Sequence, residues 1–138
     1  MNTLPIRLTP GQDLRVALEA VVRERGCRAA FVISGIGGLG DARIRFAGAD
    51  QAQTLGGDSE ILSLCGTVGV DEEGRSHSHL HMSVSTATGA VFGGHVLPGC
   101  RVRTTAEVLL GLLPGWAFSR EADPVTGYAE LVVRPRAP

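Results

Sequence analysis

Residues 76–100 alternate between apolar and polar side chains, the pattern of β-strands with one buried face. Leu80, Met82 and Val84 fall on the apolar side of the first half, and the alternation resumes after a Thr-Ala-Thr-Gly turn signal. The two apolar faces coincide only if the connecting loop has an odd number of residues, because a one-residue slip turns every side chain over. The sequence therefore predicts a β-hairpin with a three-residue loop at residues 87–89.

This hairpin contains all four histidines of the chain. In the predicted register His81 lies directly opposite His95, and His79 precedes His81 by two residues on the same polar face. Paired β-carbons are about 4.5–5.5 Å apart, and alternate residues of a strand are about 6.5–7 Å apart. Three imidazoles at these spacings can converge on one point. His77 continues the same face, but it begins the strand and we expect it to be peripheral.

Three neutral imidazoles with an open fourth position form a known zinc arrangement, which also suits iron or nickel. We therefore predict a divalent metal site at His79, His81 and His95, with zinc as the favoured ion. The alternative is a set of half-exposed histidines that bond only backbone and solvent.

Glu107 is the predicted partner of this cluster, because it lies in a segment of threonine and aliphatic residues where an unpaired carboxylate is costly. Three roles remain open on the metal side: a fourth ligand, an acceptor that orients an imidazole, or a general base acting on metal-bound water. A salt bridge to Arg103 is the structural alternative. Cys100 follows the hairpin and is predicted to be buried.

The length of 138 residues is enough for one domain with a real core. We expect that domain over residues 1–134, followed by a short disordered tail at 135–138. No apolar run reaches the 18 residues of a membrane span, and no secretory signal is recognised at the N-terminus. The three cysteines are widely spaced and form no CxxC pair. These features predict a cytoplasmic protein with reduced thiols.

The flanking segments predict further elements. A strand at residues 4–8 precedes a helix that begins at Thr9-Pro10-Gly11-Gln12, a capping-box pattern, and ends at Gly26. Residues 28–36 are a predicted strand and 48–58 a loop. Residues 59–68 are a strand, and 101–113 fit a central strand better than a helix. An irregular segment begins at residue 116, a turn spans 123–127, and a final strand spans 128–133.

Residues 35–40 read Gly-Ile-Gly-Gly-Leu-Gly, which matches the GxGxxG spacing of dinucleotide-binding proteins. That fingerprint requires the glycines to open a helix. The following residues 41–47 instead alternate with period two, as in a strand. We therefore predict a tight connection between two strands here rather than a nucleotide site.

Several motifs occur in a fixed order over nearly the whole chain. They are Ser34-Gly35-Ile36-Gly37, Glu60-Ile61-Leu62-Ser63-Leu64-Cys65-Gly66, His79-Leu80-His81, Gly93-Gly94-His95, Gly99-Cys100, Arg103-Thr104-Thr105-Ala106-Glu107-Val108, and Asp123-Pro124 with Thr126-Gly127-Tyr128. Together they strongly resemble the PPC (plants and prokaryotes conserved) domain.

The resemblance implies an α/β (α+β) domain, with a mostly antiparallel β-sheet and flanking helices, that assembles as a homotrimer. It also implies DNA as a partner, since plant members carry AT-hook segments and bacterial members are commonly labelled DNA-binding. In this chain Arg134-Pro135-Arg136 lacks the glycine of such a hook, and Gly57-Asp58-Ser59-Glu60 replaces the plant Gly-Arg-Phe-Glu motif. The net charge of −1 gives no surplus for phosphate neutralisation.

Three functional hypotheses follow. The first is a trimeric protein that binds a divalent metal through His79, His81 and His95, with the open position facing a pocket for a small-molecule ligand. The second is a DNA-binding or chromatin-associated module. The third is a metal-dependent hydrolase, which requires a carboxylate such as Glu107 near the ion.

Overall fold

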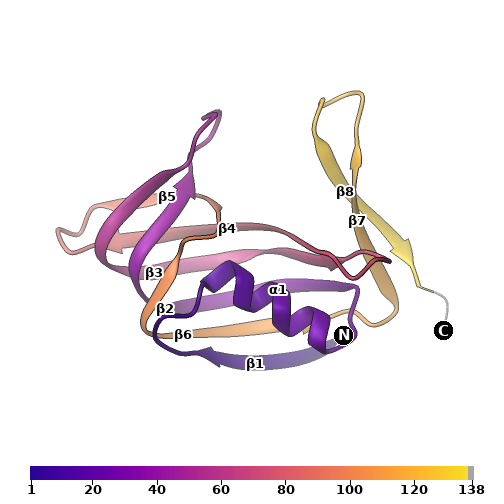
Figure 1. The fold of residues 1–138 in the computed structure, drawn as a ribbon, viewed down its shortest axis with the longest axis horizontal. Helices are drawn as coiled ribbons and strands as arrows, with labels where there is room; N and C mark the ends of the chain where they lie inside the picture. Colours follow the sequence, from indigo (N-terminus) through magenta and orange to yellow (C-terminus); the bar gives the residue numbers. More distant parts are fainter. Residues whose placement is uncertain (137–138) are drawn as a thin grey trace.

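The computed structural model describes residues 1–136, so Ala137 and Pro138 of the predicted tail lie outside the described residues. One helix packs against a six-stranded antiparallel sheet of order β1-β6-β2-β3-β4-β5, and a two-stranded β7–β8 hairpin projects from it (Figure 1). The elements are β1 (Asn2–Leu8), α1 (Leu14–Glu24), β2 (Ala29–Arg45), β3 (Gln53–Val70), β4 (Ser76–Thr86), β5 (Val91–Val96), β6 (Arg101–Leu112), β7 (Trp116–Ala122) and β8 (Ala129–Pro135). Within residues 1–136, no helix is both long and apolar enough to cross a membrane.

The predicted mostly antiparallel sheet is confirmed, with a single helix among the described residues. Helix α1 buries Leu14, Leu18 and Val22 completely against the sheet, the stripe that its 3.6-residue periodicity predicts. The predicted start at residues 9–12 is wrong. Asp13 is the N-cap, because its carboxylate accepts a hydrogen bond from the Val16 backbone N–H.

Strand β2 runs without interruption through the glycine-rich segment. The predicted strand-to-strand connection at residues 35–40 is therefore wrong, whereas the absence of a helix after the glycines agrees with the sequence. Gly37 has φ of 147°, and a Cβ there would overlap the carbonyl oxygen of Thr105 and lie 2.6 Å from the Cα of Ala106. The glycines let β2 approach β6 closely while its register shifts.

The length of β2 also explains why β3 begins at Gln53, inside the predicted loop. Residues 53–56 lack a strand-like pattern, yet they pair with residues 41–44 of β2. Beyond that point β2 pairs with β5, through Ile44 opposite Val96 and Arg45 opposite His95. The sheet thus curls until β5 contacts both β4 and β2.

The predicted hairpin is confirmed. The Thr86 N–H donates to the Ala90 carbonyl, Gly89 has a left-handed φ of 82°, and His81 pairs with His95. Leu80, Met82 and Val84 are buried, as the alternation predicts. The predicted central strand at residues 101–113 is β6, which lies between β1 and β2.

The C-terminal segment, residues 116–136, differs from the prediction where it begins and where it ends. The expected irregular stretch is β7, which is anchored because Phe118 is 2% exposed and packs edge-to-face against Phe31 with ring centroids 5.6 Å apart. Strand β8 extends through Pro135, the first residue of the predicted tail. The Arg136 N–H donates to the Gly115 carbonyl.

A Gly37→Ala substitution tests the close approach of β2 and β6. We expect it to lower the free energy of unfolding by about 2–4 kcal/mol, because the added methyl group overlaps backbone atoms at an unfavourable φ. Gly40→Ala is the matched control, since no atom lies within 4 Å of a Cβ there, and it should change stability by less than about 1 kcal/mol. Urea denaturation measures both. Equal effects of the two substitutions would contradict the close-approach explanation.

Candidate metal centre

The three predicted ligands lie on the polar face of β4 and β5, opposite the buried residues of the same strands. His81 pairs with His95 across the hairpin, while β3 supports β4 from the other side. His95 is the residue at which β5 passes from β4 to β2, since it also pairs with Arg45. Because the sheet curls, His95 is held by β4 on one side and by β2 on the other.

The imidazoles of His79, His81 and His95 converge as the sequence predicts. His79 Nε2, His81 Nε2 and His95 Nδ1 lie 3.1 Å from one another, in an equilateral triangle. Each nitrogen contributes either a lone pair or a proton toward the same small space. Hydrogen bonds satisfy such a triangle poorly, because one N–H cannot point along two sides at once. A shared cation would accept all three lone pairs.

The spacing of these nitrogens fits a first-row divalent metal. Nitrogens 3.1 Å apart that bind one ion at about 2.0–2.1 Å subtend about 98° at it. That angle lies between the 90° of octahedral and the 109° of tetrahedral coordination. The donor set therefore accommodates zinc and also leaves room for iron or nickel.

The surroundings of the cluster favour neutral imidazoles. Partial desolvation lowers the pKa of His79, and the positive charge of Arg120 adds to this effect. Desolvation, followed by the charge of Arg45, likewise lowers the pKa of His95. Neutral imidazole is the form that binds a metal, so both residues are held in the ligating state near pH 7.

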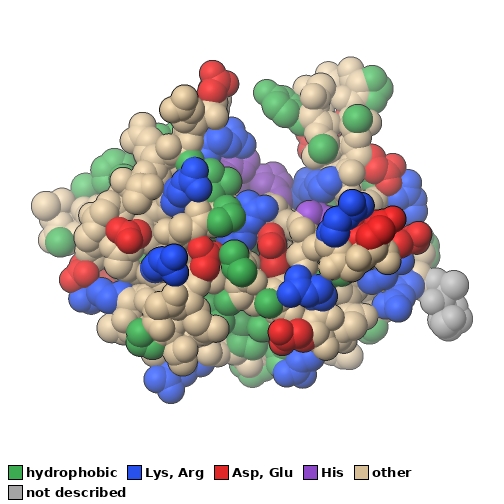
Figure 2. Space-filling model, in the orientation of Figure 1, with side chains coloured by type: hydrophobic (Ala, Val, Ile, Leu, Met, Phe, Trp, Pro, Cys, Tyr) green, Lys and Arg blue, Asp and Glu red, His purple; other side chains and the backbone are tan. Residues whose placement is uncertain are grey.

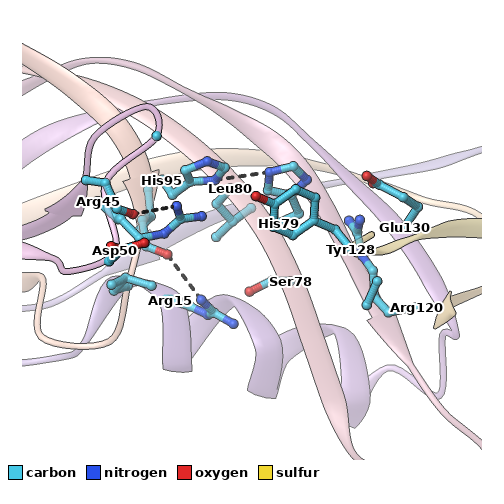
Figure 3. Close-up of a pocket in the computed structure, with 15 residues that line it drawn as sticks. Arg15, Arg45, Asp50, Ser78, His79, Leu80, His95, Arg120, Tyr128 and Glu130 are labelled. Carbon is cyan, nitrogen blue, oxygen red and sulfur yellow. Dashed lines mark hydrogen bonds between the residues drawn. The ribbon is translucent and has the colours of Figure 1, made fainter. Parts of the chain in front are cut away.

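A cavity of about 670 Å³ opens beside His79 and His95. The turn at residues 46–52 and the β7–β8 hairpin project in the same direction (Figure 1), and the histidines lie in the hollow between two projecting parts (Figure 2). In Figure 3, Arg45 lies on one side of the two imidazoles and Arg120 on the other. A ligand on the free side of an ion would face this cavity.

The remaining sequence-predicted residues lie elsewhere. His77 is peripheral, as predicted, and its Nε2 lies 3.1 Å from the Phe118 carbonyl oxygen. Cys100 is fully buried, and burial raises the pKa of its thiol to about 11. Glu107 is exposed on β6, opposite Arg7 and Ile36.

Two strands separate β6 from β4, and Glu107 is not among the residues whose ligand atoms converge with those of the histidines. The structure therefore does not bring Glu107 to the cluster within one chain. The predicted partner Arg103 instead bonds Asp58 at 2.7 Å. Two carboxylates line the cavity, Asp50 and Glu130 of β8, and the sequence singled out neither of them.

The sequence pattern also does not single out Arg45 and Arg120, although both line the cavity. Arg45 is the last residue of β2, and Arg120 belongs to β7, which the sequence predicts as an irregular segment. Their placement depends on the curl of the sheet and on the docking of the β7–β8 hairpin. The alternation of residues along one segment predicts neither feature.

Comparison with known proteins places the chain among related folds. A solved hypothetical protein from Salmonella cholerae-suis is 38% identical, with a TM-score of 0.91 over 99% of this chain and 95% of that one. A metal-containing protein from Archaeoglobus fulgidus is 28% identical, with a TM-score of 0.79 over 96% and 94% of the two chains. A Bacteroides thetaiotaomicron protein whose name proposes DNA binding is 21% identical, with a TM-score of 0.81 over 96% and 91%.

A curated relative, the bifunctional protein GlmU of Synechococcus sp. (strain JA-2-3B'a(2-13)), is 43% identical over 137 residues. The match covers 99% of this chain but 21% of the relative, so the chain spans about a fifth of that protein's length. The family model of the Plants and Prokaryotes Conserved (PCC) domain matches residues 1–114, in agreement with the motifs of the sequence. The chain therefore belongs to the Plants and Prokaryotes Conserved domain family.

Proposed function

We propose that this protein binds a divalent metal ion, zinc by preference, through His79, His81 and His95. The observation that carries the proposal is the triangle of three ring nitrogens 3.1 Å apart. The solved relative named as a metal-containing protein supports it. Among the described residues, these histidines are also the one group of three or more His, Cys, Asp or Glu side chains with ligand atoms close enough to share an ion.

Three protein ligands characterise sites that exchange water or substrate, whereas structural zinc sites usually have four. The bound ion would supply a Lewis acid at the base of the cavity. The chain's own residues position the three imidazoles, favour the neutral form of His79 and His95, and surround the open side with polar groups. We infer that the site holds a small-molecule ligand.

The hydrolase alternative needs a carboxylate near the ion, and within one chain Glu130 is better placed for that role than Glu107.

Metal analysis of protein purified without chelator or affinity metal tests the proposal. We expect close to one zinc, iron or nickel ion per chain in the unmodified protein, and at least a tenfold loss in a His81→Ala variant, because two imidazoles bind far more weakly than three. His77→Gln is the control and should retain the metal, since His77 bonds the Phe118 carbonyl instead. Absence of stoichiometric metal from the unmodified protein would contradict the proposal. Equal metal content in the unmodified protein and the two variants would also contradict it.

We also propose that the protein is a homotrimer, as the family resemblance implies. The sheet face opposite α1 carries exposed apolar residues that suit a subunit contact. Ile33, Ile36 and Leu62 on the adjacent strands β2 and β3 are 43%, 55% and 53% exposed. Contiguous exposed apolar residues commonly mark interaction surfaces.

An Ile36→Lys substitution tests this interface. We expect light scattering to give three times the chain mass for the unmodified protein and a smaller mass for the variant, because burying the lysine charge is unfavourable. Val16→Lys on α1 is the control, as Val16 is similarly exposed at 51% but lies on the helix layer. A monomeric unmodified protein, or an Ile36→Lys protein that remains trimeric, would contradict the assignment.

DNA binding is the second candidate, favoured by the names of solved proteins that share the fold. Both are below 25% identical to this chain, so they support the fold alone. DNA affinity arises chiefly from phosphate neutralisation, and the chain carries 13 basic against 14 acidic residues. We therefore expect no measurable binding to a 30-base-pair duplex at physiological salt. Binding that weakens steeply as the salt concentration rises would favour DNA binding over metal binding as the function.

We propose a cytoplasmic location on the chemistry of the cysteines. Cys27, Cys65 and Cys100 are all free thiols, and Cys65 is exposed. An exposed thiol in the free form suits a reducing compartment.

A further inference from the structure

The cavity beside the histidines has walls from distant parts of the chain. Residues 48–50 of the β2–β3 turn form one side, and residues 128–130 at the start of β8 form the other. His79 and His95 form part of its floor (Figure 3). A second cavity shares His79, Arg120 and Glu130 with the first, so residues of the β7–β8 hairpin line both cavities. The volume of about 670 Å³ suits a small organic molecule.

Arg45 and Arg120 are half-buried guanidinium groups that face this cavity. Each donates one hydrogen bond to the protein, Arg45 to the Ala49 carbonyl at 3.1 Å and Arg120 to the Thr67 hydroxyl at 3.1 Å. Neither is within salt-bridge distance of a carboxylate among residues 1–136. A guanidinium has five N–H donors, so most donors of both groups remain available to a ligand.

The third arginine of the cavity differs in this respect. Arg15 of α1 forms an ion pair with Glu19 at 3.0 Å and donates to the Val96 carbonyl. Its charge is thus already compensated by the protein. Arg45 and Arg120 are therefore the arginines of the cavity that can recognise a ligand by charge.

The charges around the cavity balance until an ion is added. Asp50 and Glu130 also line it, and together they offset Arg45 and Arg120. Imidazoles bind a metal in their neutral form, so a divalent ion held by the three histidines would leave two positive charges without a counterpart. Isolated charge in a partly desolvated site is costly. A negatively charged ligand removes that cost.

We propose that the cavity binds a small organic oxyanion, with one oxygen directed to the metal ion and the remainder of the anionic group hydrogen-bonded by Arg45 and Arg120. This inference rests on the proposed metal function. Planar guanidinium groups match the geometry of carboxylate and phosphate oxygens. Arg120 lies on a hairpin that follows residue 114, beyond the part of the chain that the family model matches. Ligand preference is thus set partly outside the matched domain.

Calorimetric titration of the zinc-loaded full chain tests the proposal with three probes of similar shape. Benzoate and phenylphosphonate carry the two oxyanion chemistries, and benzamide is the neutral control. We expect binding of at least one anion with no detectable binding of benzamide. The tighter of the two anions identifies carboxylate or phosphate as the preferred group.

Substitution of the two arginines tests their role. Arg45→Gln and Arg120→Gln should each weaken binding of the preferred anion at least tenfold while metal content stays unchanged, which shows that the fold and the metal centre are intact. Arg43→Gln is the matched control, because Arg43 lies two residues from Arg45 on β2 but does not line the cavity. It should bind as the unmodified protein does.

Metal content measured on the same samples separates the two claims. Protein that lacks metal contradicts the proposed function. Full metal content with equal binding of benzoate and benzamide, or with unchanged anion affinity in both arginine variants, overturns the oxyanion proposal alone.

Discussion

The odd-length loop of the β4–β5 hairpin is the constraint on which the candidate site depends. Because the loop has three residues, the apolar residues of both strands face the core together, and His81 lies opposite His95. A loop of two or four residues would place one of the two strands with its histidine toward the core. The same hydrophobic pattern that folds the hairpin therefore also brings the three imidazoles together, and the cluster requires no separate folding device.

The curl of the sheet provides the second half of the site. Strand β2 is 17 residues long and pairs with β6, β3 and finally β5. The glycines near its centre permit register shifts and a close approach to β6. As a result Arg45 at the end of β2 lies opposite His95. The β7–β8 hairpin adds Arg120 from the other side, and the histidines become the floor of a cavity rather than a flat surface patch.

The sequence predicts those parts of the structure that depend on local periodicity. The hairpin, its register, the buried stripe of α1 and the convergence of His79, His81 and His95 all follow from alternation along one or two neighbouring segments. The predictions are wrong where contacts between residues far apart in the sequence determine the structure. Residues 35–40 resemble a turn because glycines are common in turns, but here Gly37 and Gly38 lie close against β6. The unusual setting of Glu107 among threonine and aliphatic residues predicts a partner, but it carries no information about the order of the strands.

The central claim is that one metal ion lies among three ring nitrogens of this hairpin. The most direct measurement is an anomalous difference map from crystals of chelator-free protein, with data collected on both sides of the zinc, iron and nickel absorption edges. The account predicts one peak per chain, about 2.0–2.2 Å from His79 Nε2, His81 Nε2 and His95 Nδ1. A map with no peak among these nitrogens, or with its peak at other residues, would contradict it.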